Sequence, residues 1–408
     1  MTDVDRRTFL THAAGGVAAM ALVPNLSAFG SYSLNATLRV GVIGVGRQGR
    51  EILGELTKLT DVEVTAMCDT DERRLSAGLR RASGAEGYNT VDEMLSSGKV
   101  DAAVVATSTH THREVALKCF NAGVHVYLEC PLAHTLEDCI AISEAARGAK
   151  GVIAAGLQGR ANPVYQLARG FYKTDSVRDP VSMRAQQHRK TNWITPSNDS
   201  ARYQDLNWKL DPNRSNGLAG EWGTQQFDVF HWYSDKYPVK VFGTGSVRHW
   251  RDDRKVPDTI ACTLMFDDEQ TIHYDASLAN SYGGTYEVLY GSNAAIKLGW
   301  SHGWMFKEAD APTQGWEVYA NRQQFHNDEG ITLIAGATKL AEQGKLKEGI
   351  GLPHPGVYYA LEDWVNAIAT SGSPACSISE AARATAVGIA ANEAVMKRGI
   401  VDINFSGL

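Results

Sequence analysis

The segment "VYLECPLAHT", residues 126–135, places a thiol directly beside a carboxylate. Glu129, Cys130 and Pro131 follow an apolar run, so they stand where a buried strand is expected to end. A cysteine in such a position can act as a nucleophile, a metal ligand, a redox switch or a small apolar filler. Each alternative implies a different protein, and the surrounding chain has to decide between them.

A glycine-rich turn is the second feature with a chemical meaning. In "LRVGVIGVGRQGREILGEL" an apolar strand runs into a G-x-G-x-x-G motif, and a helix is expected to follow. Glycines let the backbone approach a pyrophosphate, and the free N–H groups at the start of a helix favour an anion. The cofactor-binding residues expected in this turn are Gly44, Gly46, Arg47, Gln48 and Gly49.

Asp69 ends a second expected strand, "VEVTAMCD", twenty residues after Gly49. A carboxylate at this point accepts hydrogen bonds from ribose hydroxyls and repels a 2′-phosphate, which favours NAD over NADP. NADP is the less favoured alternative, because Arg73 and Arg74 follow nearby.

Strands and helices then continue to alternate through "VDAAVVAT", "HREVALKCFNAG" and "VHVYLE", which indicates a doubly wound parallel sheet. Ligands bind at the carboxyl ends of such strands. The further residues expected to contact the cofactor are Thr107, His110, His112, Glu129 and Gln158. An H-x-H pair needs an additional carboxylate or imidazole to complete a metal site, and no metal is predicted.

The first 34 residues are predicted to be a Tat-type signal peptide, outside the fold. Arg6 and Arg7 precede an apolar run from Ala13 to Val23. This run is too short to span a hydrocarbon layer of about 30 Å, so no stable membrane anchor is expected. The Tat route exports folded proteins to the periplasm, which suits an enzyme that acquires its cofactor in the cytoplasm. An Arg pair on a Sec signal is the alternative.

Length and charge narrow the class of protein. A chain of 408 residues predicts two domains, with boundaries at 35–155 and 156–408. Strand segments with glycine and aspartate turns indicate an antiparallel sheet in the second domain. With 40 basic and 46 acidic residues the net charge is −6, and no basic stripe marks a nucleic-acid surface. Six scattered cysteines are too few for a disulfide framework.

An ordered set of segments resembles the Gfo/Idh/MocA oxidoreductases over nearly all of the mature chain. These segments are "GVIGVGRQG", "ATSTHTHREVALKCFNAGVHVYLECPLA", "AAGLQGRANP", "EWGTQQFDVFHW" and "YYALEDWVNAIATSGSP". The resemblance implies an N-terminal Rossmann domain for NAD and a C-terminal α+β domain with a large open antiparallel sheet. It also implies a sugar or cyclitol substrate, and a homodimer or homotetramer formed through the open sheet.

The chain departs from the family where protons are usually moved. The usual Glu-Lys-Pro is Glu129, Cys130 and Pro131, and the usual Asp-x-Gly-x-His-x-x-Asp aligns with Glu221, Gly223, Gln225 and Asp228. Glutamine does not titrate, and a carboxylate beside Cys130 favours the neutral thiol. We therefore expect Cys130 to fill the place of the lysine without its role, whereas Glu221 keeps an acid in the motif.

Other side chains offer alternative proton carriers. In "MRAQQHRKTNW" alternate residues share one face of a strand, which groups Gln186, His188 and Lys190. The corresponding strand borders the substrate pocket in the family, and an exposed edge with solvated charges is the alternative. The residues predicted to take part in the chemistry are Glu221, His188, Lys190, Gln225 and Cys130. The predicted substrate contacts are Arg160, Trp193, Trp222 and Asp228.

Three functions fit these observations. The first is an exported NAD-dependent sugar oxidoreductase, with a cofactor that stays bound between turnovers. The second is an NAD-dependent glycoside hydrolase that works by transient oxidation and elimination. The third is a carbohydrate-binding protein without catalysis. The polar segment from Thr195 to Gly217 is long for a connection and is expected to cover a carbohydrate.

Overall fold

The computed structural model of the chain describes residues 36–325 and 328–408, so the expected signal peptide lies outside the described residues. The described residues form two compact units. The larger unit comprises residues 36–162, 183–287 and 355–408, and the smaller comprises 163–182 and 288–354. No helix in the described ranges is both long and apolar enough to cross a membrane.

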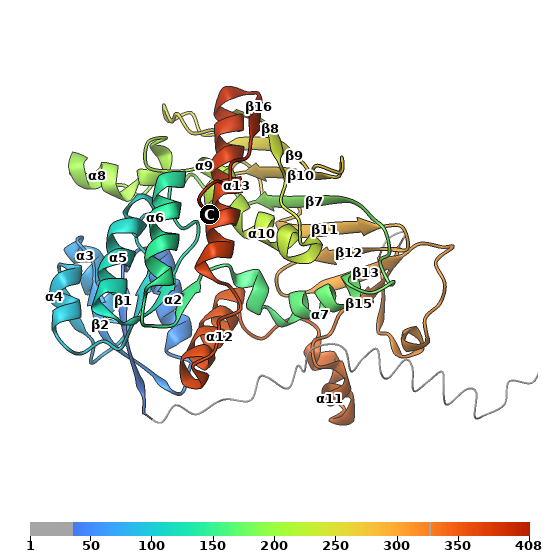
Figure 1. Cartoon of the computed structure of the whole chain (residues 1–408), viewed down its shortest axis with the longest axis horizontal. Helices are drawn as coiled ribbons and strands as arrows, with labels where there is room; N and C mark the ends of the chain where they lie inside the picture. Colours follow the sequence, from blue (N-terminus) through green and yellow to red (C-terminus); the bar gives the residue numbers. More distant parts are fainter. Residues whose placement is uncertain (1–35, 326–327) are drawn as a thin grey trace, which may run out of the picture. The chain divides into compact units, whose positions relative to one another are not determined.

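A six-stranded sheet with the order β3-β2-β1-β4-β5-β6 forms the first part of the larger unit (Figure 1). Its strands are β1 (Leu38–Ile43), β2 (Val62–Cys68), β3 (Glu86–Tyr88), β4 (Ala102–Val105), β5 (His125–Leu128) and β6 (Ile153–Ala155). All neighbours pair in parallel. The strand order reverses between β1 and β4, which creates the crevice where doubly wound sheets bind ligands.

The helices between these strands are α2 (Arg47–Leu56), α3 (Glu72–Leu79), α4 (Val91–Ser96), α5 (His112–Ala122) and α6 (Leu136–Arg147). The sequence of β4, Ala-Ala-Val-Val, is apolar throughout, and every residue of this strand is buried. Such continuous apolar runs are typical of parallel strands that are covered on both faces. The predicted doubly wound domain is therefore confirmed.

A second sheet, mixed and mostly antiparallel, continues the larger unit in the order β7-β10-β9-β8-β16. These strands are β7 (Pro180–His188), β8 (Lys240–Ser246), β9 (Thr259–Met265), β10 (Thr271–Ser277) and β16 (Ile400–Asp402). Only the β7–β10 pair among these is parallel. The predicted antiparallel sheet is thus confirmed, with this parallel pair as an addition.

Three helices cover one face of this sheet: α9 (Gly217–Glu221), α10 (Gly223–Ser234) and α13 (Ile378–Lys397). Tyr274 of β10 points to them, and its ring centroid lies 5.0 Å from that of Phe227 on α10. Because side chains alternate along a strand, Asp275 belongs to the opposite face. Helix α12 (Gly356–Thr370) packs on α2 of the parallel-sheet domain.

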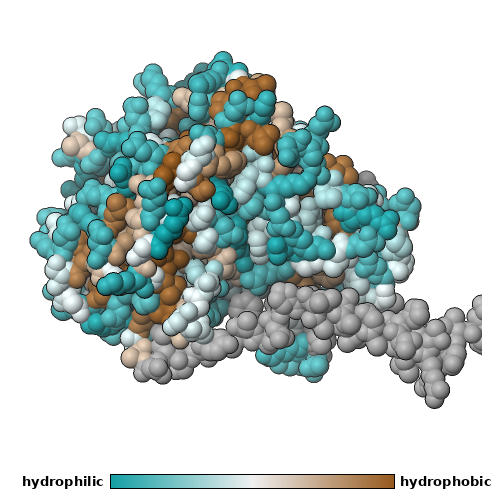
Figure 2. Space-filling model, viewed as in Figure 1, coloured by the Kyte–Doolittle hydropathy of each residue, from teal (hydrophilic) through white to brown (hydrophobic). Residues whose placement is uncertain are grey.

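The face opposite to these helices carries exposed apolar side chains near the sheet edge. Phe242 of β8 and Ile400 of β16 are directly opposite each other in the antiparallel pair, with exposures of 43% and 65%. Figure 2, viewed from the side that carries α13, shows apolar atoms at the end of this helix as well, near β16.

The smaller unit contains α7 (Pro163–Tyr172) and the strands β12 (Ala294–Leu298), β13 (Gly303–Lys307), β15 (Glu329–Thr332) and β14 (Arg322–Gln324). Helix α7 packs on β12 and β13. Gly303 leaves room for this contact, since a Cβ there would lie 2.8 Å from Val164. Strand β11 (Thr285–Gly291) connects the two units along the chain.

Candidate active site

The glycine turn between β1 and α2 forms a cradle that has no room for a side chain at Gly44 or Gly49. Gly44 has φ +87°, and a Cβ there would lie 2.7 Å from the carbonyl oxygen of Ala106. A Cβ on Gly49 would lie 1.9 Å from the carbonyl oxygen of Gly44. Helix α2 begins after Gly46 without a side-chain cap, so its first N–H groups point into this turn. The turn has the form of an anion site at a helix N-terminus.

Asp69, at the end of β2, stabilises this cradle by hydrogen bonds. One carboxylate oxygen accepts the N–H of Val45 at 2.8 Å, and the other accepts the N–H of Asp71 at 2.9 Å. Burial raises the pKa of Asp69, and these two hydrogen bonds oppose the rise. The carboxylate therefore stands next to the glycine turn, with lone pairs left for a further donor.

His112 connects two loops at the carboxyl edge of the parallel sheet. Its Nδ1 lies 3.1 Å from the carbonyl oxygen of Pro131, and its Nε2 lies 3.2 Å from that of Thr107. Burial lowers the pKa of this ring to about 4, so it is neutral and donates from one nitrogen. Thr107 also accepts a hydrogen bond from the Thr111 hydroxyl at 2.9 Å. His112 acts by holding the edge loops together.

Some buried polar atoms at this edge have no hydrogen-bond partner among the described residues. They include Nδ1 of His110 and Oε1 of Glu129. Burial raises the pKa of Glu129 to about 8, and a hydrogen bond from Gln48 opposes the rise. Buried polar groups normally have partners, so atoms without one favour a bound molecule. The cradle and these atoms together fit a dinucleotide that runs along the edge.

Glu221, at the end of α9, faces the loop that follows β4. Its side chain is 3% exposed, and it accepts hydrogen bonds from Thr109 at 3.2 Å and Ser215 at 3.4 Å. Lys209 Nζ lies 3.9 Å from the same carboxylate. Burial raises the pKa of Glu221, and Lys209 lowers it. This acid is therefore poised between its protonated and ionised forms at a higher pH than an exposed glutamate.

Both polar atoms of the Gln225 amide form hydrogen bonds with the backbone. Its Nε2 donates to the carbonyl of Gly156 at 2.7 Å, and its Oε1 accepts the N–H of Gln158 at 3.1 Å. These contacts fasten α10 to the segment after β6. Gln225 thus holds the site in place, and its amide does not titrate.

Cys130 is half-buried against an apolar cluster that includes Leu132, Cys376 and Ile378. Burial raises the pKa of its thiol far above the ordinary value, and Cys376 and Glu129 raise it further. A neutral thiol in apolar surroundings is a poor base and a poor nucleophile. The environment is that of a filler.

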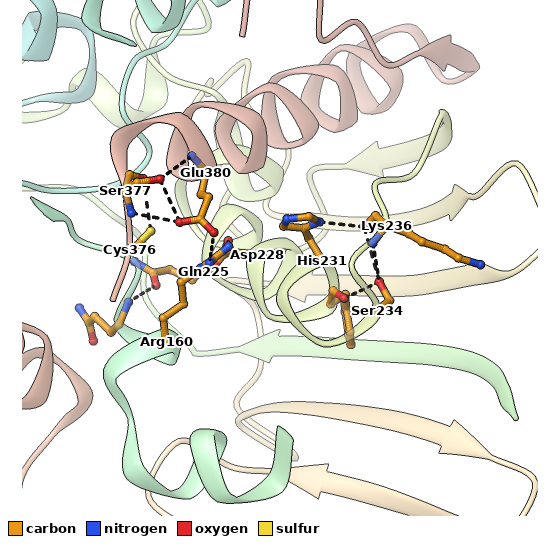
Figure 3. Close-up of polar contacts among 11 residues, drawn as sticks. Arg160, Gln225, Asp228, His231, Ser234, Lys236, Cys376, Ser377 and Glu380 are labelled. Carbon is orange, nitrogen blue, oxygen red and sulfur yellow. Dashed lines mark hydrogen bonds and ion pairs between the residues drawn. The ribbon is translucent and has the colours of Figure 1, made fainter. Parts of the chain in front are cut away.

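Arg160 and Asp228 form a buried ion pair beneath the site. Arg160 donates from Nε and Nη2 to the two oxygens of Asp228, both at 2.8 Å, and the side chains are 4% and 1% exposed. Figure 3 shows Arg160 between Asp228 of α10 and Glu380 of α13, with which it also forms an ion pair. The two predicted substrate residues are brought together, and they hold three segments of the larger unit in register.

His188 and Lys190 are not brought to Glu221. His188 shares the face of Asp275, opposite to the face that α9 and α10 cover, and its Nε2 lies 2.6 Å from Asp275. It lines a separate surface depression of about 520 Å³. Lys190 is exposed, and its N–H donates to Ser281 at 2.8 Å.

Two domain-sized matches identify the family. Residues 38–157 match the oxidoreductase family with an NAD-binding Rossmann fold, GFO_IDH_MocA, and residues 181–297 match the GFO/IDH/MocA C-terminal domain. The chain belongs to the Gfo/Idh/MocA family. Its parallel-sheet domain is the NAD-binding Rossmann fold of that family.

Relatives of this Gfo/Idh/MocA protein include two inositol dehydrogenases. Inositol 2-dehydrogenase 2 of Saccharopolyspora erythraea is 37% identical over 131 residues, 32% of this chain and 39% of that protein. Inositol 2-dehydrogenase of Salmonella typhimurium is 26% identical over 211 residues, 50% of this chain and 58% of that protein. The matched region thus spans about half the length of these relatives.

Solved structures share the fold at low identity. Levoglucosan dehydrogenase in complex with NADH and levoglucosan superposes with a TM-score of 0.70, over 90% of this chain and 99% of that chain, at 17% identity. At this identity the likeness describes the fold alone.

One residue of this Gfo/Idh/MocA site, Lys209, is missing from the sequence-based expectations. It lies in the short helical turn η4 (Trp208–Leu210), within the long polar segment. Its Nζ is 5.3 Å from the ring centroids of both Trp193 and Trp208. In the sequence, only the neighbouring Trp208 in "NWKL" pointed to a positioned Lys209. The contact with Trp193 results from the fold. Trp222 completes the group, with its ring 5.4 Å from that of Trp193.

Proposed function

We propose that the protein is an exported NAD-dependent oxidoreductase that acts on a hydroxyl group of a sugar or cyclitol. The observation that carries this proposal is the buried Glu221 carboxylate, with its raised pKa, at the carboxyl edge of a Rossmann sheet. The names of the relatives, inositol 2-dehydrogenase and levoglucosan dehydrogenase, favour oxidation of a polyol over glycoside hydrolysis or binding alone.

The cofactor-holding residues follow from the cradle. The glycine turn and the start of α2 receive the pyrophosphate, and Asp69 receives ribose hydroxyls. Glu129 and His110 offer their unpartnered atoms at the same edge of the sheet. A bound NAD would supply the hydride acceptor for the carbinol carbon of the substrate.

Glu221 serves as the proton acceptor for the substrate hydroxyl. A carboxylate with a raised pKa is closer in basicity to the working pH, which makes it a better general base than an exposed glutamate. Thr109 and Ser215 orient its oxygens by hydrogen bonds. Trp193 and Trp222 offer aromatic faces on which the apolar side of a sugar ring can stack.

A slowly released cofactor is part of this proposal. Segment 195–216 contacts the parallel-sheet domain at several points along the cofactor edge. Arg202 binds Asp71 near Asp69, the Trp208 ring lies 5.9 Å from His110, and Asn216 donates to the carbonyl of Ala133. An exported enzyme retains its cofactor better when such a segment hinders release. The twin-arginine leader in the sequence supports export to the periplasm.

We also propose a homo-oligomer, a dimer or a tetramer, through the open sheet. Phe242 and Ile400 form an exposed apolar pair on the face opposite to the helices. Exposed apolar side chains grouped on one face are typical of subunit interfaces.

The deciding experiment starts with the nucleotide that co-purifies with the protein. Mass spectrometry of the denatured extract should detect NAD rather than NADP. The protein should then reduce NAD, followed by absorbance, with a panel that includes myo-inositol, levoglucosan and free hexoses. Product release from aryl glycosides without net reduction of NAD would favour the hydrolase, and no turnover of any substrate would favour a binding protein.

A further inference from the structure

Lys209 is the cation nearest to the candidate base among the described residues. Its Nζ lies 3.9 Å from Glu221 Oε2, and it also lowers the pKa of Glu129. One ammonium therefore acts on two buried carboxylates that belong to different parts of the larger unit. This position is unusual because η4 belongs to a long segment outside both sheets.

Lys209 and Glu221 are close enough for one further oxygen atom to lie beside both of them. A distance of 3.9 Å exceeds a hydrogen bond, which for an ammonium and a carboxylate is about 2.7–2.9 Å. An ammonium has three donors, and an oxygen placed beside both groups can accept from Lys209 while it donates to Glu221.

The tryptophan rings define where the ammonium lies. Nζ is 5.3 Å from the centroids of Trp193 and Trp208, within the range of cation–π contacts. These contacts hold the long side chain in one place although 36% of it is exposed. A positioned charge is more effective than a flexible one, because little reorganisation is needed during reaction.

We propose that Lys209 is a catalytic residue that donates a hydrogen bond to the substrate hydroxyl oxygen undergoing oxidation, while Glu221 accepts the proton of that hydroxyl. The O–H bond breaks and its proton passes to Glu221. The C–H electron pair leaves as a hydride to NAD, and the C=O bond forms. The Lys209 ammonium stabilises the negative charge that develops on the oxygen. This inference rests on the proposed oxidoreductase function.

The test uses the full-length protein with Lys209→Met, and Lys240→Met as the matched control. Lys240 is an exposed lysine of β8 that also faces a carboxylate, 3.8 Å from Asp402, on the sheet face opposite to α9 and α10. We expect Lys209→Met to lower kcat by about 10² to 10³, by analogy with the loss of one oxyanion donor. The Kd for NADH, measured by fluorescence, should stay within about twofold, because the cradle is unchanged.

A second readout separates chemistry from folding. Because Lys209 lowers the pKa of Glu221, its removal should raise that pKa, which isotope-edited NMR of the glutamate carboxyls can follow. The acid limb of the kcat/KM profile should move to higher pH in parallel. Lys209→Cys followed by aminoethylation restores an ammonium of similar reach and should recover turnover.

The outcomes are distinct. Turnover in the native protein that persists in Lys209→Met, with an unmoved Glu221 titration, overturns the role of Lys209 and leaves the oxidoreductase function intact. Absence of polyol oxidation in the native protein overturns the proposed function and this inference together.

Discussion

Arg202 Nε donates to Asp71 Oδ2 at 2.7 Å and joins two residues that lie 131 positions apart in the chain. Asp71 also caps α3 and follows Asp69 by two residues, so the contact lies beside the expected ribose site. Arg202 belongs to α8 (Ser200–Leu206), in segment 195–216. The far end of this segment is held by Asn216, which donates to the carbonyl of Ala133 at 3.0 Å.

Loss of the Arg202 contact should speed cofactor release. A charge-assisted hydrogen bond contributes about 1.5 kcal/mol or more, which corresponds to roughly tenfold in a rate or an affinity. We expect Arg202→Ala to raise the dissociation rate of NADH about tenfold in stopped-flow fluorescence, with kcat nearly unchanged at saturating NAD. Arg214→Ala is the control, because Arg214 pairs with Asp205 and Asp211 inside the same segment. Equal release rates for both variants would remove this segment from cofactor retention.

Glu221→Gln should abolish the proton acceptor without disturbing the fold. The amide keeps the size of the side chain and still accepts from Thr109, but it takes no proton. General base catalysis contributes about 10² to 10⁴ in rate, so kcat should fall by at least about 10². Native turnover should fall with decreasing pH as Glu221 becomes protonated, at a higher pH than an ordinary glutamate because burial raises its pKa. A variant that kept native kcat would assign the base elsewhere.

Cys130→Ala and Cys130→Ser should keep most of the turnover. The thiol is neutral because burial raises its pKa, and it touches the apolar cluster of Leu132 and Ile378. Iodoacetamide at mildly alkaline pH should therefore label Cys130 far more slowly in the folded protein than in urea, as peptide mass spectrometry can show. Should Cys130→Ala remove turnover while NADH binding and the circular dichroism spectrum persist, a catalytic thiol would replace the filler interpretation.

The parts of this site that were predictable are those whose residues are close in sequence. The glycine turn and Asp69 belong to one strand-turn-helix-strand unit, so spacing alone brings them together. The alternation of side chains in β7 correctly predicted that Gln186 and His188 share one face. It did not predict which face of the sheet the helices cover. That depends on the packing of α10 against Tyr274, a tertiary contact.

Lys209 and Arg202 escaped prediction for a related reason. Both lie in a polar segment without a regular hydrophobic pattern, and their partners Glu221 and Asp71 belong to other elements. An ion pair between residues that are distant in the sequence depends on the tertiary fold. The hydrophobic periodicity of the sequence does not predict such a contact. From the sequence, Gln225 was interpreted as the replacement of a histidine that transfers protons in the family. Only its hydrogen bonds with Gly156 and Gln158 show that it links α10 to the segment after β6.

Charges at the apolar pair on the open sheet should dissociate the oligomer. Phe242→Glu combined with Ile400→Glu places two like charges directly opposite each other on adjacent strands, at the face where a second subunit would bind. Sedimentation velocity should show a monomer for the double variant and a dimer or tetramer for the native protein. Thr57→Glu, at an exposed position of the parallel-sheet domain, is the control. A native monomer at micromolar concentration would refute the interface.

Glu129 should make the stability of the cofactor-free protein fall as pH rises. The pKa of this carboxyl is about 8 in the folded chain, where burial favours the protonated form, and near 4.5 ordinarily. Below pH 4.5 the group is protonated in both states, so it adds nothing to the pH dependence. Between pH 4.5 and 8 it ionises in the unfolded chain first, and the folded state loses stability, by a few kcal/mol at most over this window.

Glu129→Gln removes this loss, since an amide does not ionise. In urea unfolding, the stability of Glu129→Gln relative to the native protein should therefore increase from pH 5 to pH 8 and level off above it. Glu144→Gln, at an exposed position of α6, should show a constant difference. A difference for Glu129→Gln that does not change with pH would mean that Glu129 is ionised in the folded protein, and its unpartnered oxygen would then carry a negative charge at the cofactor edge.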